Sequence, residues 1–219
     1  MILQKFHYGQ VLQPRQLVLM LHGYGANGKN LLELACELQK AVPQALFISV
    51  NAVEPWEGGF PDCYQWFSLY NQNLQRKELP EIAASIISAN QKLAIFIKQQ
   101  LNELQLGYQN LALLGFSQGA MMANYQAMTL PQKIAGVLSY SGKVILPTLL
   151  QQNIIHKPKV CLIHGTDDSV LSFDNFLEAK QIFDKLFIPY EDFALTNLDH
   201  SIDYRGLEIG KQFLQKIFI

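Results

Sequence analysis

The sequence predicts an α/β protein with a mostly parallel sheet and helices on both of its faces. Short apolar runs alternate along the chain with longer segments of helical periodicity, a pattern typical of a doubly wound sheet. Most of the apolar runs are continuous, as expected for strands that are buried on both faces. The 219 residues are 49% hydrophobic and 16% charged, which suits one domain over residues 1–219 with one large core.

The pattern predicts six main strands, at 17–21, 45–50, 110–114, 134–140, 159–163 and 188–195, and one or two edge strands within 2–11. Helices are expected at 30–40, 118–128 and 172–186, and a last one from near Ser201. A long helix is expected from Pro80, where proline suits the first turn, to Gly107, where glycine suits the end. Ligand sites in such sheets form at the carboxyl ends of the strands.

Residues 51–79 form the longest stretch without a regular pattern, and they are rich in glycine, proline and aromatic residues. Loops of this length are usually functional or disordered, and the aromatic content argues against disorder. We therefore predict a loop that covers an apolar pocket. The alternative is a surface loop held down by its aromatic side chains.

The pentapeptide Gly115-Phe116-Ser117-Gln118-Gly119 has the pattern G-x-S-x-G between an apolar run and a helix-competent run. A serine at such a strand-turn-helix corner has a strained backbone and an exposed hydroxyl. The flanking glycines are needed because a side chain there would clash with the neighbouring strand and helix. The pattern favours Ser117 as a catalytic nucleophile.

A serine nucleophile needs a histidine base and an acid that orients it, in the chain order Ser, Asp or Glu, His. Of the five histidines, only His200 follows the acidic loop that begins at Gly165. It stands in the loop between the last expected strand and the last expected helix. The acidic loop offers two candidate acids, Asp167 and Asp168, and adjacent side chains point in different directions. The one that does not orient His200 is expected to cap the local turn.

An oxyanion hole requires backbone N–H groups aimed at the oxygen that gains charge in the transition state. The residue after the nucleophile supplies one, here Gln118 at the start of its helix. The second comes from the loop after an early strand, and we assign it to Tyr24 in Leu21-His22-Gly23-Tyr24-Gly25. The Tyr24 ring is also a candidate for lining the acyl site.

The same loop permits a rival interpretation, because residues 23–28 match G-x-G-x-x-G after a strand and before a helix. A dinucleotide-binding protein would carry an acid at the end of the next strand, but that strand ends in Asn51. An oxyanion loop is therefore the better interpretation. A third possibility is a catalytically silent binding module with the same fold.

Together these residues resemble the carboxylesterase, lysophospholipase and acyl-protein thioesterase family of small α/β-hydrolases. The resemblance rests on four stretches in family order: Leu21–Gly25, Gly115–Ala120, His164–Val170 and Asp199–Ser201. It implies the α/β-hydrolase fold and an activity on carboxylic esters (EC 3.1 class). The third residue after the acid-loop glycine is catalytic in the family, which selects Asp168, and Trp66 resembles the family's tryptophan beside the acyl pocket.

The chain departs from the family pattern at three positions. The family often has Asp where Ser68 stands, Pro where Ser169 stands and Gly where Asp199 stands. None of these departures removes a group of the expected triad. They leave the preferred substrate open.

We therefore expect a serine hydrolase that cleaves carboxylic esters, with acyl thioesters or lysophospholipids as further substrates, through an acyl-enzyme on Ser117. Asp168 and His200 complete the triad, Tyr24 and Gln118 form the oxyanion hole, and Trp66 and Leu171 line the substrate pocket. No cofactor or metal is expected, since neither paired histidines nor clustered cysteines occur.

Charge and hydropathy limit the partners that we expect. The net charge is −1 without a basic run, so no nucleic-acid partner is expected, and no apolar run is long enough for stable membrane insertion. Three scattered cysteines suggest reduced thiols and a cytoplasmic location. An aromatic covering loop makes a homodimer possible.

Overall fold

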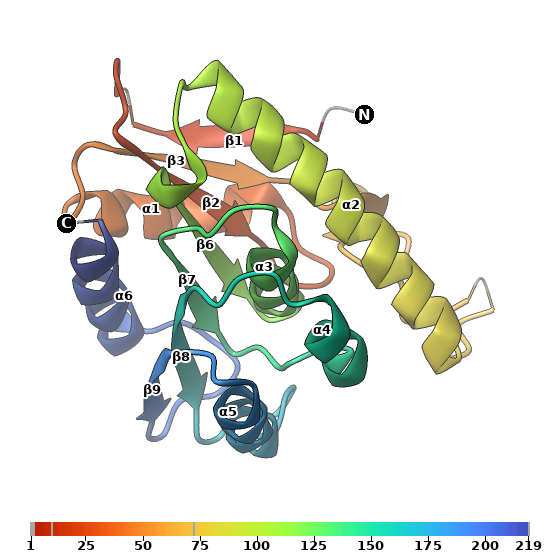
Figure 1. Cartoon of the computed structure of the whole chain (residues 1–219). Helices are drawn as coiled ribbons and strands as arrows, with labels where there is room; N and C mark the ends of the chain where they lie inside the picture. The colour runs from red at the N-terminus through yellow and green to blue at the C-terminus, as the bar shows by residue number, and fades with distance from the viewer. Residues whose placement is uncertain (1–2, 10, 72, 219) are drawn as a thin grey trace.

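The central sheet has seven strands in the spatial order β1-β3-β2-β6-β7-β8-β9 (Figure 1). The computed structural model describes residues 3–9, 11–71 and 73–218. The strands are β1 (Lys5–Tyr8), β2 (Gln16–Leu21), β3 (Ala45–Val50), β6 (Leu111–Phe116), β7 (Gly136–Tyr140), β8 (Lys159–Gly165) and β9 (Tyr190–Leu195). Strand β1 pairs antiparallel with β3 at one edge, and every other pairing of this sheet is parallel. The prediction of a mostly parallel sheet is confirmed.

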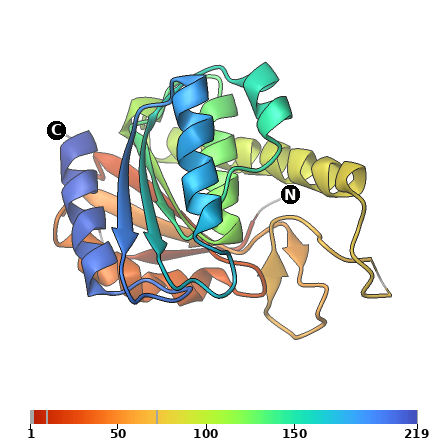
Figure 2. The ribbon, with the colours of Figure 1, turned by 90° about the horizontal axis from the view of Figure 1, so that it is seen from below.

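Within the described residues, six α-helices cover this sheet: α1 (Leu32–Gln39), α2 (Leu79–Glu103), α3 (Gln118–Thr129), α4 (Pro147–Asn153), α5 (Asp174–Leu186) and α6 (Tyr204–Ile217). Helices α1 and α6 bury their apolar side chains on one face, and α2, α3, α4 and α5 bury theirs on the other (Figure 2). Neighbouring strand residues point to opposite faces. Leu17 and Leu19 accordingly pack on the face covered by α2, α3, α4 and α5, while Val18 and Met20 pack on the face covered by α1 and α6. Helices on both faces are thus confirmed.

The sheet has a switch in strand order between β2 and β6. From β2 the chain passes by α1 to β3 on one side, while β6, β7, β8 and β9 follow one another on the other side. Connections that leave two adjacent strands in opposite directions open a crevice at the carboxyl ends of these strands. Strand β6 ends just before Ser117, and β2 ends just before His22, so both of these residues lie at the carboxyl edge of the sheet, at this switch in strand order.

Several element boundaries differ from the predicted ones for identifiable reasons. The last helix begins at Tyr204, because the Asp203 carboxylate accepts the N–H of Gly206 and caps the helix there. The helix expected over 30–40 is a 3-10 turn, Gly28–Leu31, followed by α1. Helix α4 was not predicted, because it is only seven residues long and has little periodicity.

The segment 51–79 contains a two-stranded hairpin that the sequence pattern did not predict. Strand β4 (Glu54–Pro55) pairs antiparallel with β5 (Tyr64–Gln65), and Tyr64 also bridges to Ala26 in the loop after β2. The hairpin is therefore joined to the loop that carries Tyr24.

Of the expected edge strands within 2–11, β1 is present, while residues 2 and 10 lie outside the described residues. Within the described ranges, no helix combines the length and the apolar character that a membrane crossing requires.

Candidate active site

Ser117 stands at a sharp corner between β6 and α3. Its backbone has φ 54° and ψ −119°, a conformation that costs a residue with a side chain about 1–3 kcal/mol. A side chain at Gly115 would lie 2.4 Å from the backbone of Ala120, and one at Gly119 would lie 2.0 Å from the carbonyl oxygen of Leu21. The two glycines are therefore required, as the sequence predicted, and they let the corner pack tightly against β2.

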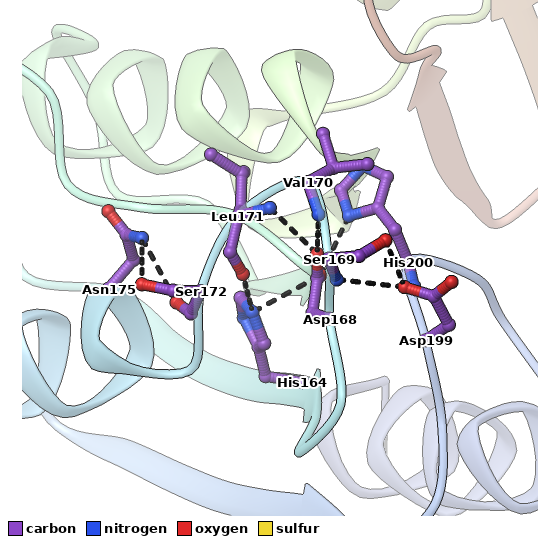
Figure 3. A network of polar contacts seen from close by, with 9 residues as sticks. All are labelled: His164, Asp168, Ser169, Val170, Leu171, Ser172, Asn175, Asp199 and His200. Carbon is purple, nitrogen blue, oxygen red and sulfur yellow. Dashed lines mark hydrogen bonds and ion pairs between the residues drawn. The ribbon is translucent and has the colours of Figure 1, made fainter.

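Asp168 and His200 form a direct hydrogen bond (Figure 3). Nδ1 of His200 lies 2.7 Å from Oδ2 of Asp168. The Asp168 side chain is fully buried, and that of His200 is 14% exposed. Since the carboxylate accepts, Nδ1 carries the hydrogen, which leaves Nε2 of His200 able to accept a proton.

The Asp168 carboxylate has three further neighbours that hold it in place. Oδ1 accepts the N–H groups of Val170 at 3.0 Å and Leu171 at 2.7 Å. Nε2 of His164 lies 3.3 Å from Oδ2 and donates to the carbonyl oxygen of Leu171 at 2.9 Å. Burial lowers the pKa of His164, so it contributes a neutral N–H rather than a charge. Sequence reasoning missed this second histidine, although it stands at the end of β8, four residues before Asp168.

Asp167 forms no hydrogen bond or ion pair with His200 in the described structure. Its carboxylate accepts the hydroxyl of Thr166 at 2.7 Å in an exposed turn, as expected for the acid that caps the loop. Of the two candidates that the residues alone left open, the structure joins Asp168 to the histidine.

Phe116 connects the serine corner to the hydrogen-bonded pair of Asp168 and His200. Its ring centroid lies 4.8 Å from that of His200. A side chain at Gly23 would approach Ser117 Cβ to 3.4 Å and the Phe116 ring to 3.2 Å. Ser117, the loop after β2 and His200 therefore meet at one end of the sheet.

Neither the N–H of Tyr24 nor that of Gln118 has a hydrogen-bond acceptor among the described residues. Gln118 is the first residue of α3, where the helix leaves N–H groups without intrahelical partners. These are the two donors that the sequence assigns to the oxyanion hole.

His22 fixes the direction of the Tyr24 N–H. Its Nε2 accepts the N–H of Ala52 at 2.9 Å, so Nδ1 carries the hydrogen and donates to the carbonyl oxygen of Gly23 at 2.7 Å. In a trans peptide the C=O and the following N–H point in opposite directions. With the Gly23 carbonyl directed toward His22, the N–H of Tyr24 faces away from it. Sequence reasoning did not assign this role to His22.

The neutral state of His22 makes the fold sensitive to acid. Burial lowers the pKa of His22 from 6.5 to about 4, so between these values the unfolded chain binds a proton that the folded chain does not. The protonation of His22 should therefore lower the free energy of unfolding by about 3 kcal/mol as the pH drops from 6.5 to 4.

Urea unfolding measured across this pH range tests that expectation. His22→Asn should flatten the slope, whereas His7→Gln, at an exposed position of β1, should leave it unchanged. If His22→Asn fails to fold, an NMR titration of the ring in the parent protein gives the same answer. A His22 ring that titrates near pH 6.5 would contradict the expectation.

The glycine-rich loop uses its N–H groups internally rather than as a phosphate cradle. Gly25 donates to the carbonyl oxygen of Tyr64 at 2.9 Å, and Gly28 donates to Oδ1 of Asn51 at 2.9 Å. A side chain at Gly28 would meet the ring of Phe6 at 2.8 Å, so this glycine is needed for packing. The contacts disfavour the dinucleotide interpretation.

Trp66 lies beneath the site, and its side chain has no exposed surface in this structure. Its indole N–H donates to the carbonyl oxygen of His22 at 2.9 Å. Its backbone N–H donates to Oε1 of Gln118 at 2.8 Å, and Nε2 of Gln118 donates to the carbonyl oxygen of Phe67 at 2.8 Å. Trp66 thus holds the loop after β2 from beneath, and its expected place beside an acyl pocket stays a prediction. Leu171 is half-buried beside Asp168.

Glu57 gathers the segment 51–79 around Tyr24. Its carboxylate accepts hydrogen bonds from two hydroxyls, two backbone N–H groups and one amide: Tyr24, Ser68, Leu69, Tyr70 and Gln65. Burial alone would raise the pKa of Glu57, but these hydrogen bonds, led by that of Ser68, hold it below its ordinary value. Sequence reasoning missed this residue. The available signal was Ser68. The family often has an acid at this position, and here the Ser68 hydroxyl donates to the carboxylate of Glu57 instead.

Among residues 3–9, 11–71 and 73–218, no group of three or more His, Cys, Asp or Glu side chains is arranged to hold a metal ion.

A family model described as phospholipase/carboxylesterase matches residues 10–218. The chain belongs to this family. The fold is accordingly the α/β-hydrolase fold, and the chain is a carboxylesterase-type hydrolase, as the sequence predicted.

Similar proteins agree with this assignment over nearly the whole chain. Esterase YpfH of Escherichia coli (strain K12) is 26% identical over 205 residues, 92% of this chain and 82% of that protein. Acyl-protein thioesterase 1 of Saccharomyces cerevisiae is 29% identical over 219 residues, with 94% of each protein covered. The crystal structure of esterase PE8 matches with a TM-score of 0.91 and 31% identity, covering 99% of this chain and 100% of that one.

Proposed function

We propose that this chain hydrolyses carboxylic esters and acyl thioesters through an acyl-enzyme on Ser117. The observation that carries the proposal is the 2.7 Å hydrogen bond between His200 and the buried Asp168, at the same end of the sheet as the Ser117 corner. A buried carboxylate that accepts Nδ1–H fixes the tautomer of the histidine and stabilises the imidazolium that forms during the reaction.

In the proposed reaction, the Ser117 hydroxyl attacks the acyl carbon while Nε2 of His200 takes its proton. The N–H groups of Tyr24 and Gln118 stabilise the oxyanion. The imidazolium then protonates the leaving alcohol or thiol, and the acyl group remains on Ser117. Water, activated by His200, attacks the acyl-enzyme and releases the carboxylic acid.

The nature of the acyl substrate follows from two indications. The similar proteins are named esterase and acyl-protein thioesterase, which supports both leaving groups. The segment 51–79 carries large apolar side chains that are exposed, among them Phe60 and Leu74, each 67% exposed. Phe60 stacks on Trp56, whose ring packs edge-on against that of Tyr24. This apolar surface beside Tyr24 supports an apolar acyl group, with Leu171 lining its site. The free thiols Cys36, Cys63 and Cys161 support a reducing compartment, and we propose the cytoplasm.

The mechanism is tested by the partition of a common intermediate. An oxygen ester and a thioester with the same acyl group should both be hydrolysed and should form the same acyl-Ser117. In the presence of methanol, the ratio of methyl ester to free acid should therefore be the same for both substrates. A ratio that depends on the leaving group would contradict the acyl-enzyme, and failure to turn over any ester would favour a silent binding module.

A further inference from the structure

The two residues that depart from the family pattern next to the triad contact each other. Oδ1 of Asp199 accepts the N–H of Ser169 at 2.8 Å, the hydroxyl of Ser169 at 2.8 Å and the N–H of His200 at 2.7 Å (Figure 3). Ser169 directly follows Asp168, and Asp199 directly precedes His200. One carboxylate oxygen therefore joins the loop of the proposed acid to the loop of the proposed base.

Besides the bond between His200 and Asp168, few hydrogen bonds join the described residues of these loops, and one of them runs from the N–H of Thr166 to the carbonyl oxygen of Leu195 at 2.9 Å. The N–H of Asp167 donates to the carbonyl oxygen of Leu198 at 3.1 Å, and the N–H of Asn197 donates to the Thr166 hydroxyl at 3.2 Å. Beyond them, residues 199–203 have no regular secondary structure before α6 begins. The hydrogen bonds of the Asp199 carboxylate join the two loops directly beside His200 in the chain.

The residues common in the family could not form this tie. Proline in place of Ser169 would have neither N–H nor hydroxyl, and glycine in place of Asp199 would have no carboxylate. Here both departures occur together and face each other. This pairing indicates that Ser169 and Asp199 together hold the two loops in place, rather than being two independent surface changes.

We propose that Asp199 is a positioning residue that holds the loop of His200 against the loop of Asp168 through Ser169. The inference rests on the proposed function. Asp199 acts through the N–H groups of Ser169 and His200 and the Ser169 hydroxyl, so it sets the distance between His200 Nδ1 and Asp168 Oδ2 without touching the substrate. The same hydrogen bonds, led by the Ser169 N–H, lower the pKa of Asp199, so the acceptor is ionised at neutral pH.

The expected effect is moderate, because both Ser169 and Asp199 are exposed and water competes for their hydrogen bonds. Asp199→Ala should lower kcat/KM for a p-nitrophenyl ester about tenfold, mainly through kcat. Asp199→Asn keeps an Oδ1 acceptor and should stay within about threefold of the parent. Asp167→Ala is the matched control, an exposed aspartate on the other side of Asp168, and it should leave kcat/KM unchanged.

A double variant shows whether Ser169 and Asp199 act together or independently. If Ser169 and Asp199 act as one unit, Ser169→Ala combined with Asp199→Ala should be no slower than Asp199→Ala alone. Equal losses in Asp199→Asn and Asp199→Ala would show that the charge matters rather than the hydrogen bonds. Unchanged kcat in Asp199→Ala would likewise overturn the proposal.

A spectroscopic measurement keeps this test independent of the proposed reaction. In a Ser117→Ala background, the low-field NMR resonance of His200 Nδ1–H should be present, should survive Asp199→Asn and should weaken in Asp199→Ala at an unchanged Tm. A resonance unaffected by Asp199→Ala would overturn the positioning role. Failure of the proposed function would instead appear as turnover that persists in Ser117→Ala with this resonance intact.

Discussion

Ser117→Ala should lower kcat for ester hydrolysis by ~10⁶-fold, because removing the nucleophile disables the triad as a unit. The backbone N–H groups of Tyr24 and Gln118 are untouched, so a residual rate above that of water should remain. The substitution should not unfold the protein, since the Ser117 hydroxyl has no hydrogen-bond partner among the described residues. Steady-state kinetics and thermal unfolding of the purified variant measure both effects.

Ser201→Ala is the matched control for this prediction. Ser201 is an exposed serine directly after His200, and its substitution should change kcat by less than about twofold, as surface substitutions generally have small effects. An active Ser117→Ala together with an inactive Ser201→Ala would move the nucleophile to the other serine and contradict the assignment.

Asp168→Asn should lower kcat by ~10⁴-fold, because the side-chain amide inverts the hydrogen bonding at His200. The amide oxygen can still accept the N–H groups of Val170 and Leu171, which leaves the amide NH₂ facing His200 Nδ1. Nδ1 must then accept, so the hydrogen moves to Nε2, and the ring can no longer take the proton of Ser117. The loss should appear in kcat, measured with saturating ester.

In the Asp168→Asn variant, the amide NH₂ would also face the N–H of His164, which lies 3.3 Å from the same oxygen in the parent protein. Some loss of Tm is therefore expected, and Asp167→Asn provides the comparison at an exposed neighbour. Activity above a tenth of the parent value in Asp168→Asn, with the fold intact, would remove Asp168 from the proposed triad.

The sequence predicted those parts of the structure that depend on local pattern. The strand expected at 45–50 has the observed bounds of β3, because its apolar run is bounded by Pro43 and Asn51. The Ser117 corner was predictable because only a few residue types fit the two crowded positions at Gly115 and Gly119. The short helix α4 was missed because seven residues carry too little periodicity.

The parts of the site that the sequence did not reveal depend on contacts between distant residues. Glu57 binds the Tyr24 hydroxyl across 33 positions, and His22 accepts the N–H of Ala52 across 30. Neither residue belongs to a local motif that would assign its partner. The family resemblance suggests a place for Trp66 beside an acyl pocket, but it does not reveal that the indole N–H donates to the buried carbonyl of His22 and that the ring lies under the loop after β2.

The identity of the nucleophile is tested most directly by covalent labelling with a fluorophosphonate probe, followed by mass spectrometry of the labelled peptide. The assignment of Ser117 as the nucleophile predicts one label per chain, located on that residue. Labelling should disappear in Ser117→Ala and become slower in Asp168→Asn, because the serine then lacks a base in the correct tautomer. A label on another residue, or full labelling and turnover in Ser117→Ala, would contradict it.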